Sequence, residues 1–174
     1  MQLGLTFPLQ RKLKIKFVPY GTPLERLYCW DLHCITLRGQ DSLLLVHCAS
    51  RYTCVRFDMT PADWADLPAV AMEEIRLGLL DAGLAPDRVT AYLSAAGAPI
   101  LTRTHGRREV AFLNRAWDDV MAADLLVDRS EQRQPLLNSA VNSRPCRCAG
   151  FASTDTPQAF LERCFSEHQD GMIR

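Results

Sequence analysis

The chain has 174 residues, a length typical of one compact domain that buries about 70% of its unfolded surface. Its 20 basic and 20 acidic residues balance, so no long-range field steers nucleic acid or an acidic membrane, which disfavours a DNA-coating role. Because there is no secretory signal pattern and no run of about 20 apolar residues, we expect a cytoplasmic protein that does not span a membrane.

Seven cysteines are present, and an odd number cannot pair completely within one chain. Cys29, Cys34, Cys48 and Cys54 lie in apolar, strand-like runs, where a reduced thiol behaves as a small buried hydrophobe. The pattern therefore predicts reduced core thiols rather than a disulfide framework.

A four-thiolate zinc site could in principle combine Cys146 and Cys148 with Cys29 and Cys34. The spacing argues against it, because zinc sites usually show two Cys-x-x-Cys knuckles, whereas these pairs are separated by one and by four residues. We therefore expect no metal and no cofactor.

The first half of the chain predicts a short amphipathic helix followed by strands. Leucines recur every four residues within Leu5–Ile15, which favours the helix. Three β-rich runs then follow over Leu27–Leu37, Ser42–Cys48 and Tyr52–Phe57. Their connecting turns are so short that they can join only antiparallel neighbours, which predicts a three-stranded meander.

Helix signals dominate the next segment. Thr60 and Asp63, with a proline between them, form a capping-box pattern, and Gly83 is placed to end the helix in left-handed geometry. Three further elements are predicted in the order helix, strand and helix, over Pro86–Gly97, Pro99–Thr104 and Val110–Val120.

After Asp124 the sequence becomes polar and irregular, and we interpret residues 138–150 as part of an extended arm. Thr156 and Pro157 begin a last short helix, whose apolar stripe is expected to fold back onto the body. The predicted fold class is therefore α+β: an antiparallel three-stranded meander plus a further strand, packed by amphipathic helices. Residues 1–126 form the α+β domain, and residues 127–174 form a C-terminal arm and helix packed on it.

Two sequence pairs, His47-Cys48 and His33-Cys34, invite a nucleophile-and-base interpretation. Adjacent residues on a strand point to opposite faces, so neither pair can form the activating hydrogen bond. A Cys–His dyad would need residues from different strands, and a strand-end histidine bonded to backbone is the commoner case. We assign no catalytic residue.

Polar residues cluster at two turns, Ser50-Arg51-Tyr52 and the segment Thr102–Arg108. The second cluster runs from a strand into a helix, where the first amides of the helix favour an anion. The alternative is a capped, solvated helix start without a ligand.

At these turns the sequence resembles an uncharacterised bacterial and archaeal domain, found alone and as the N-terminal part of plasmid open-reading-frame-three-like proteins. The similarity covers about Leu5–Met121. It rests on these matching residues: Trp30, Arg38, Ser50, Arg51, Tyr52, Thr102, Thr104, Arg107 and Asn114. The family's His-Ala-Asn and Asn-Asp are replaced here. The resemblance implies a fold and a mobile-element context, and brings no activity or cofactor.

The leading hypothesis is a small non-enzymatic interaction protein of mobile-element type. A specific version of it is an anti-defence protein that inhibits a nuclease or a CRISPR system. The alternative is an enzyme acting on a phosphorylated or nucleic-acid substrate, with arginine anion clamps and a histidine base. Its candidate residues are Arg51, Arg107, Arg108, His47 and His105. A third possibility is nucleic-acid binding through a local basic stripe, but neutral net charge predicts weak affinity. We expect a protein partner.

The predicted binding site consists of Ser50, Arg51, Thr104, Arg107 and Asn114, which are expected to lie close together at one end of the sheet. This set could be a preorganised pocket for an anion or a partner. It could instead be a hydrogen-bond network that ties helix to sheet, in which Arg51 bonds backbone carbonyls.

Overall fold

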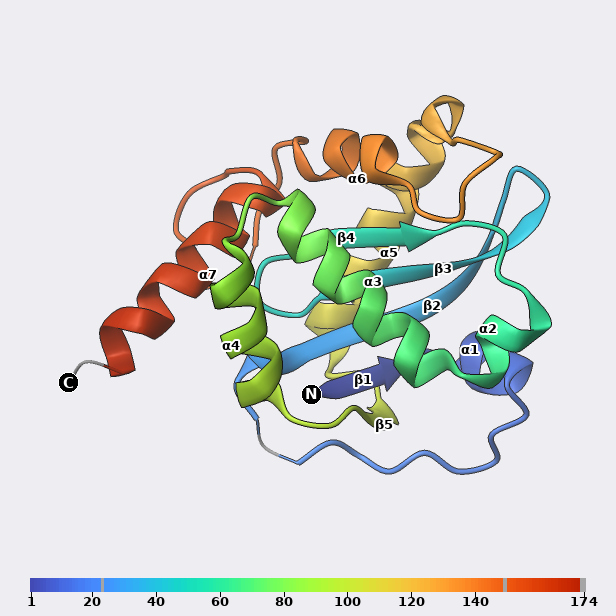
Figure 1. The fold of residues 1–174 in the computed structure, drawn as a ribbon, viewed down its shortest axis with the longest axis horizontal. Coiled ribbons are helices and arrows are strands. Elements are labelled where there is room, and N and C mark those ends of the chain that lie inside the picture. Colours follow the sequence, from blue (N-terminus) through green and yellow to red (C-terminus); the bar gives the residue numbers. More distant parts are fainter. Residues whose placement is uncertain (23, 149, 173–174) are drawn as a thin grey trace.

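The computed structural model describes residues 1–22, 24–148 and 150–172 and contains a mixed five-stranded sheet with the strand order β4-β3-β2-β1-β5 (Figure 1). The strands are β1 (Gln2–Leu5), β2 (Cys29–Leu37), β3 (Gln40–His47), β4 (Thr53–Arg56) and β5 (Ile100–Arg103). β2, β3 and β4 pair antiparallel, as the short turns predicted. The predicted α+β class, with its meander and further strand, is confirmed.

β1 was not predicted, and it lies in the interior of the sheet, parallel to both β2 and β5. The helix expected from Leu5 onwards, α1, begins only at Phe7. All four residues of β1 are buried, so this strand shows no alternation of polar and apolar side chains. A buried run of four residues cannot be distinguished from a helix start by periodicity.

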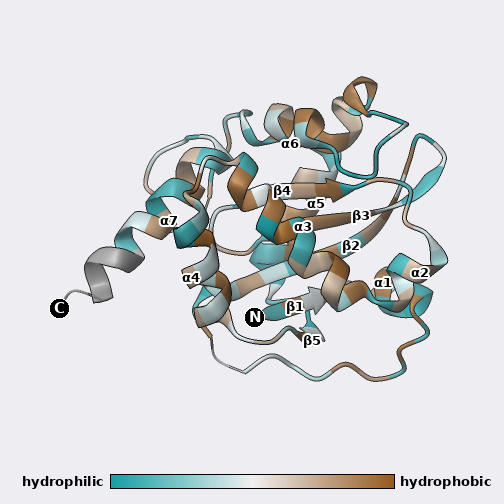
Figure 2. Ribbon diagram, in the orientation of Figure 1, coloured by the Kyte–Doolittle hydropathy of each residue, from teal (hydrophilic) through white to brown (hydrophobic). Residues whose placement is uncertain are grey.

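Helices cover both faces of the sheet (Figure 1). They are α1 (Phe7–Lys12), α2 (Pro61–Ala65), α3 (Leu67–Asp81), α4 (Pro86–Ala96), α5 (Arg107–Ala122), α6 (Pro135–Asn142) and α7 (Pro157–Met172), with 3-10 turns η1 (Arg26–Tyr28) and η2 (Asp124–Leu126). Leu43 and Leu45 of β3 face the core beneath α3 and α4, whereas Leu44 and Val46 face the core beneath α5 and α6. Both faces of β3 are thus buried, and Figure 2 shows this strand largely in hydrophobic colours.

The predicted helix signals are confirmed. The backbone N–H of Asp63 donates to Thr60 Oγ1 at 3.2 Å, and the Asp63 carboxylate accepts from the Thr60 N–H at 2.8 Å. Gly83 has φ of 87°, which lets the chain leave α3 in a left-handed conformation.

The extended arm was predicted wrongly in part, because α6 (Pro135–Asn142) lies within it. Asn138 and Asn142 lie on the buried face of α6 and bond the outer edge of β4. The Val55 N–H donates to Asn138 Oδ1 at 3.0 Å, and Asn142 exchanges two hydrogen bonds with the Thr53 backbone at 2.8 and 2.7 Å. Polar residues on the inward face interrupt the apolar periodicity that would have revealed this helix, and they satisfy an otherwise open sheet edge.

In the C-terminal segment, Leu161 and Phe165 of α7 join the core beneath α3 and α4. All seven cysteines carry free thiols. Among the helices of the described ranges, none is both apolar enough and long enough to cross a bilayer.

Candidate functional site

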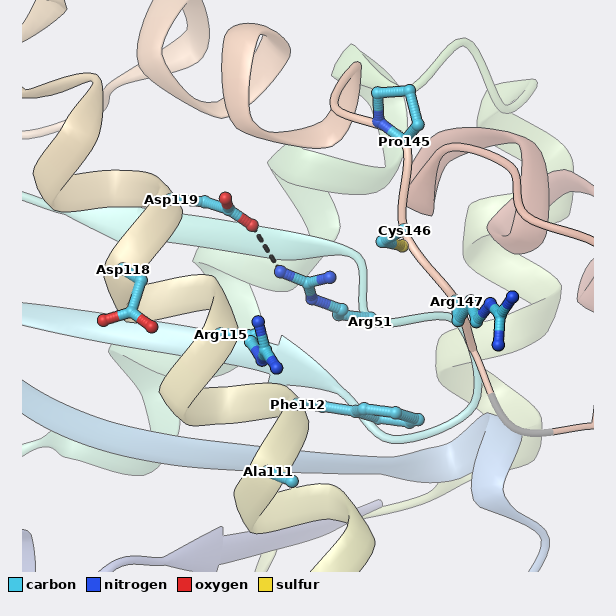
Figure 3. A pocket seen from close by; sticks show the side chains of 9 residues that line it. All are labelled: Arg51, Ala111, Phe112, Arg115, Asp118, Asp119, Pro145, Cys146 and Arg147. Atoms are coloured by element: carbon cyan, nitrogen blue, oxygen red, sulfur yellow. Dashed lines mark hydrogen bonds and ion pairs between the residues drawn. The ribbon is translucent and has the colours of Figure 1, made fainter.

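A cavity of about 490 Å³ lies between α5, the turn after β3 and the segment that follows α6 (Figure 3). We call it the arginine cavity. Its lining consists of Arg51, Ala111, Phe112, Arg115, Asp118, Asp119, Pro145, Cys146 and Arg147. These residues come from three elements that are distant in sequence, so they meet only in the folded chain.

Arg51 is held at the base of this cavity by an unusual backbone conformation. Its φ is 64°, in the left-handed region, and its N–H donates to the His47 carbonyl at 2.9 Å, which closes the turn between β3 and β4. The guanidinium is buried and forms an ion pair with the Asp119 carboxylate of α5 (Figure 3). The partner of Arg51 is thus a carboxylate, and not the backbone carbonyls that the network hypothesis expected.

Positive charge predominates around the cavity. Asp119 is shared, because Arg144 Nη1 also donates to its other carboxylate oxygen at 3.3 Å. Arg115 and Arg147 are exposed in the same lining, which holds three arginines and two aspartates. The lining therefore has a formal charge of +1, with Asp118 as its second carboxylate.

The remaining wall is apolar. Figure 3 shows the Phe112 ring extending from α5 toward the segment that carries Cys146 and Arg147. Cys146 is fixed by a pair of backbone hydrogen bonds with Asp155, at 2.7 and 3.0 Å. Burial raises the pKa of the Cys146 thiol, so the sulfur remains protonated and is a poor nucleophile at neutral pH.

The Ser50 side chain belongs to a buried hydrogen-bond network next to this cavity. It is fully buried, its Oγ lies 2.7 Å from His47 Nδ1, and it accepts the Tyr52 N–H at 3.1 Å. The other ring nitrogen of His47 lies 2.9 Å from the Leu27 carbonyl. Burial lowers the pKa of His47 to about 4, so the ring is neutral, donating to Leu27 and accepting from Ser50.

The other predicted residues lie elsewhere. Thr104 lines a second cavity of about 270 Å³, together with Gln2, Arg26 and His105. Arg107 and Asn114 are exposed on α5, seven residues apart and hence on one face of the helix. Arg51 thus lines the arginine cavity and Thr104 lines the second cavity, whereas Arg107 and Asn114 are in neither lining. The two turn segments still approach each other, because Cys48 Sγ lies 3.6 Å from His105 Nδ1.

Sequence reasoning missed a buried cluster of metal-ligand type formed by Asp31, Cys48 and His105. His105 Nδ1 lies 2.6 Å from Asp31 Oδ1 and 3.6 Å from Cys48 Sγ. Burial disfavours the charged imidazole, but the hydrogen bond and charge of Asp31 outweigh this effect and raise the pKa of His105 to about 9. The sequence indicated that any Cys–His pair would have to come from different strands. No local sequence pattern connects these three residues.

The fold is that of a small α+β domain built on a mixed five-stranded sheet. The family model described as "Domain of unknown function (DUF6933)" matches residues 2–159, and the chain belongs to this family. A search of curated proteins gives no match.

Proposed function

We propose that this protein is a non-enzymatic interaction protein whose arginine cavity receives an acidic segment of a partner protein. The observation that carries the proposal is that Arg51, Arg115 and Arg147, from three separate elements, line one cavity together with Phe112. Guanidinium groups bind carboxylates in bidentate geometry, and arginine and aromatic residues are enriched at the energetic centres of protein interfaces.

The exposed surface of α5 supports a protein partner over a small anion. Trp117 and Met121 are 39% and 43% exposed, which is substantial for large apolar side chains on one helix. They follow Asn114 by three and seven residues, so the three side chains share a flank of α5, next to the exposed strip that carries Arg107. An interface centred on α5 would thus include Arg51, Arg107 and Asn114 of the predicted site.

The enzymatic alternative is less well supported because its candidate bases are engaged. Both ring nitrogens of His47 have partners within the fold, and its low pKa makes it a weak base. The His105 side chain is 4% exposed and is held against Asp31. Turnover in a phosphatase and nuclease panel with Mg²⁺ or Mn²⁺, abolished by His47→Ala in a folded variant, would reverse this preference.

A narrower version of the proposal places the protein on mobile elements of bacteria or archaea, with a defence nuclease or CRISPR effector as its partner. It rests on the resemblance to plasmid-associated proteins. Expression in a host with an active defence system should restore phage plaquing, and Arg115→Glu/Arg147→Glu should abolish that effect. Unchanged plaquing across several defence systems would remove this version and leave the broader one intact.

Co-purification tests the broader proposal. Tagged wild-type protein and the Arg115→Glu/Arg147→Glu variant are expressed in the native organism, and bound proteins are quantified by mass spectrometry. The matched control is Arg76→Glu, which reverses an exposed arginine on α3. We expect a stoichiometric partner that is lost from the double variant and retained by Arg76→Glu. A partner retained by all three proteins, or no partner at all, would contradict the proposal.

A further inference from the structure

We propose that Asp31, Cys48 and His105 form a zinc-binding site, with Cys29 as the fourth ligand. The three side chains come from β2, the end of β3 and the segment between β5 and α5, and their ligand atoms all lie within 4.8 Å of one another. This donor set of thiolate, imidazole and carboxylate is the one that zinc takes in proteins. The site is separate from the arginine cavity, so the two proposals are independent.

The separation of Cys48 and His105 fits a tetrahedral ion. Bond lengths of about 2.3 Å to sulfur and about 2.05 Å to nitrogen place these two atoms about 3.5 Å apart on a tetrahedron. Cys48 Sγ and His105 Nδ1 are 3.6 Å apart. The Asp31 oxygen lies 2.6 Å from Nδ1 and would need to move about 0.7 Å to reach the tetrahedral separation.

His105 is oriented for metal binding through Nδ1. Its other ring nitrogen, Nε2, lies 3.3 Å from Gln2 Oε1, which can only accept a hydrogen bond. The Nε2–H therefore donates to Gln2 and leaves Nδ1 as the nitrogen that faces Asp31 and Cys48. Histidine ligands in metalloproteins are commonly fixed in this way by an acceptor on the second nitrogen.

Cys29 completes the set because it lies two residues before Asp31 on β2, so that both side chains point to the same face of the sheet. The Cys48 N–H donates to the Cys29 carbonyl at 3.0 Å, which places the two cysteines side by side. The Cys29 thiol also interacts with the His105 ring. The Cys29 thiol donates to the Glu25 carbonyl at 3.5 Å, so it would have to turn from this carbonyl toward the other three ligands to bind the ion.

The surrounding backbone leaves room for these side chains and a route of access. Gly4 lies opposite Asp31 in the register of β1 and β2, and a Cβ atom at Gly4 would lie 2.0 Å from Asp31 Oδ1 and 2.9 Å from His105 Nδ1. Only glycine permits the approach seen here. His105 also lines the 270 Å³ cavity, through which an ion can reach the site from solvent.

Cobalt substitution tests the proposal in the full chain, purified without a metal-affinity resin and stripped with chelator. We expect one Co²⁺ per chain with tetrahedral absorption and thiolate-to-cobalt charge transfer, and displacement of Co²⁺ by Zn²⁺. Cys48→Ala should reduce the intensity of the charge-transfer band by half or more, and Cys29→Ala should halve it. Gln2→Leu removes the hydrogen-bond acceptor of His105 Nε2 and should weaken zinc binding about 10- to 100-fold. Cys34→Ala, on the opposite face of β2, is the matched control and should leave binding unchanged.

X-ray absorption of the zinc-loaded wild-type protein needs no variant and covers the case in which a substitution prevents folding. It should show sulfur scatterers at about 2.3 Å together with nitrogen or oxygen at about 2.0 Å. Absence of stoichiometric binding, a spectrum with only nitrogen and oxygen neighbours, or full charge transfer in folded Cys48→Ala would overturn the proposal.

Discussion

Glu74 provides a sharp test of the energetics of this fold, because it is an acidic residue buried in α3. Its side chain is 1% exposed, its nearest cationic contact is Arg56 Nη1 at 3.8 Å, and Oε2 has no hydrogen-bond partner among the described residues. Burial raises the pKa of Glu74 to about 7, although Arg133 and Arg56 act in the opposite direction. The protonated carboxyl is therefore the stable form in the folded protein at mildly acidic pH.

The sign of the pH effect follows from this raised pKa. The stabilising contribution of Glu74 is fully present below the unfolded pKa of about 4.5 and is lost as the pH rises through about 7. Between pH 5 and pH 8 the loss amounts to about 2.5 kcal/mol of unfolding free energy. Glu74→Gln keeps the shape without the charge, so the variant should gain about 2.5 kcal/mol relative to wild type over this interval.

Urea unfolding at pH 5, 6, 7 and 8, followed by circular dichroism, measures this difference. Comparing the variant with wild type is essential, because buried His47 contributes in the opposite direction: its stability is present above pH 6.5 and lost as the pH falls through about 4. The matched control is Glu73→Gln, since Arg76 lowers the pKa of this exposed neighbour and no change is expected above pH 5. A Glu74→Gln difference that stays constant across this range would refute the reasoning.

Three further predictions concern packing, the base of the arginine cavity and the thiols. Gly78→Ala should destabilise the fold by about 1–3 kcal/mol despite the better helix propensity of alanine, because the new Cβ would lie 2.4 Å from Cys54 Sγ. In chemical denaturation, Gly78→Ala should destabilise the protein less in a Cys54→Ala background. Equal destabilisation in the two backgrounds would contradict this packing argument. Arg51→Met should lower the unfolding free energy by about 1–2 kcal/mol, and by less in an Asp119→Asn background. A double-mutant cycle with no coupling energy between Arg51 and Asp119 would show that their ion pair contributes nothing to stability. Denatured protein without reductant should titrate seven thiols, and fewer would indicate a disulfide.

The sequence predicted those parts of the fold whose signals are local. Alternating and apolar runs with short turns indicated the meander, and the capping pattern at Thr60 indicated the start of α2. β1 was not predicted because a buried strand of four residues has no distinguishing periodicity. α6 was not predicted because two polar residues, Asn138 and Asn142, face inward and bond β4. Both elements are defined by partners that lie far away in the chain.

The candidate sites were harder to predict, for the same reason. Arg51 was recognised as a polar turn residue, but its partner Asp119 lies 68 residues further along the chain on α5. The cluster of Asp31, Cys48 and His105 spans three segments, and only the alternation of Cys29 and Asp31 on one strand face offered a local signal. The strand order that assembles these residues depends on the position of β1, which the sequence pattern did not reveal.

Site-specific photo-crosslinking tests the proposed function most directly. A photoreactive amino acid replaces Ala111, which is exposed in the lining of the arginine cavity, or Ala69, which is exposed on α3 and serves as the control. In the native organism, position 111 should crosslink to an acidic segment of one protein, position 69 should not, and Arg115→Glu/Arg147→Glu should abolish the crosslink. Equal crosslinking from both positions, or none from position 111, would contradict the proposal that this cavity binds a partner.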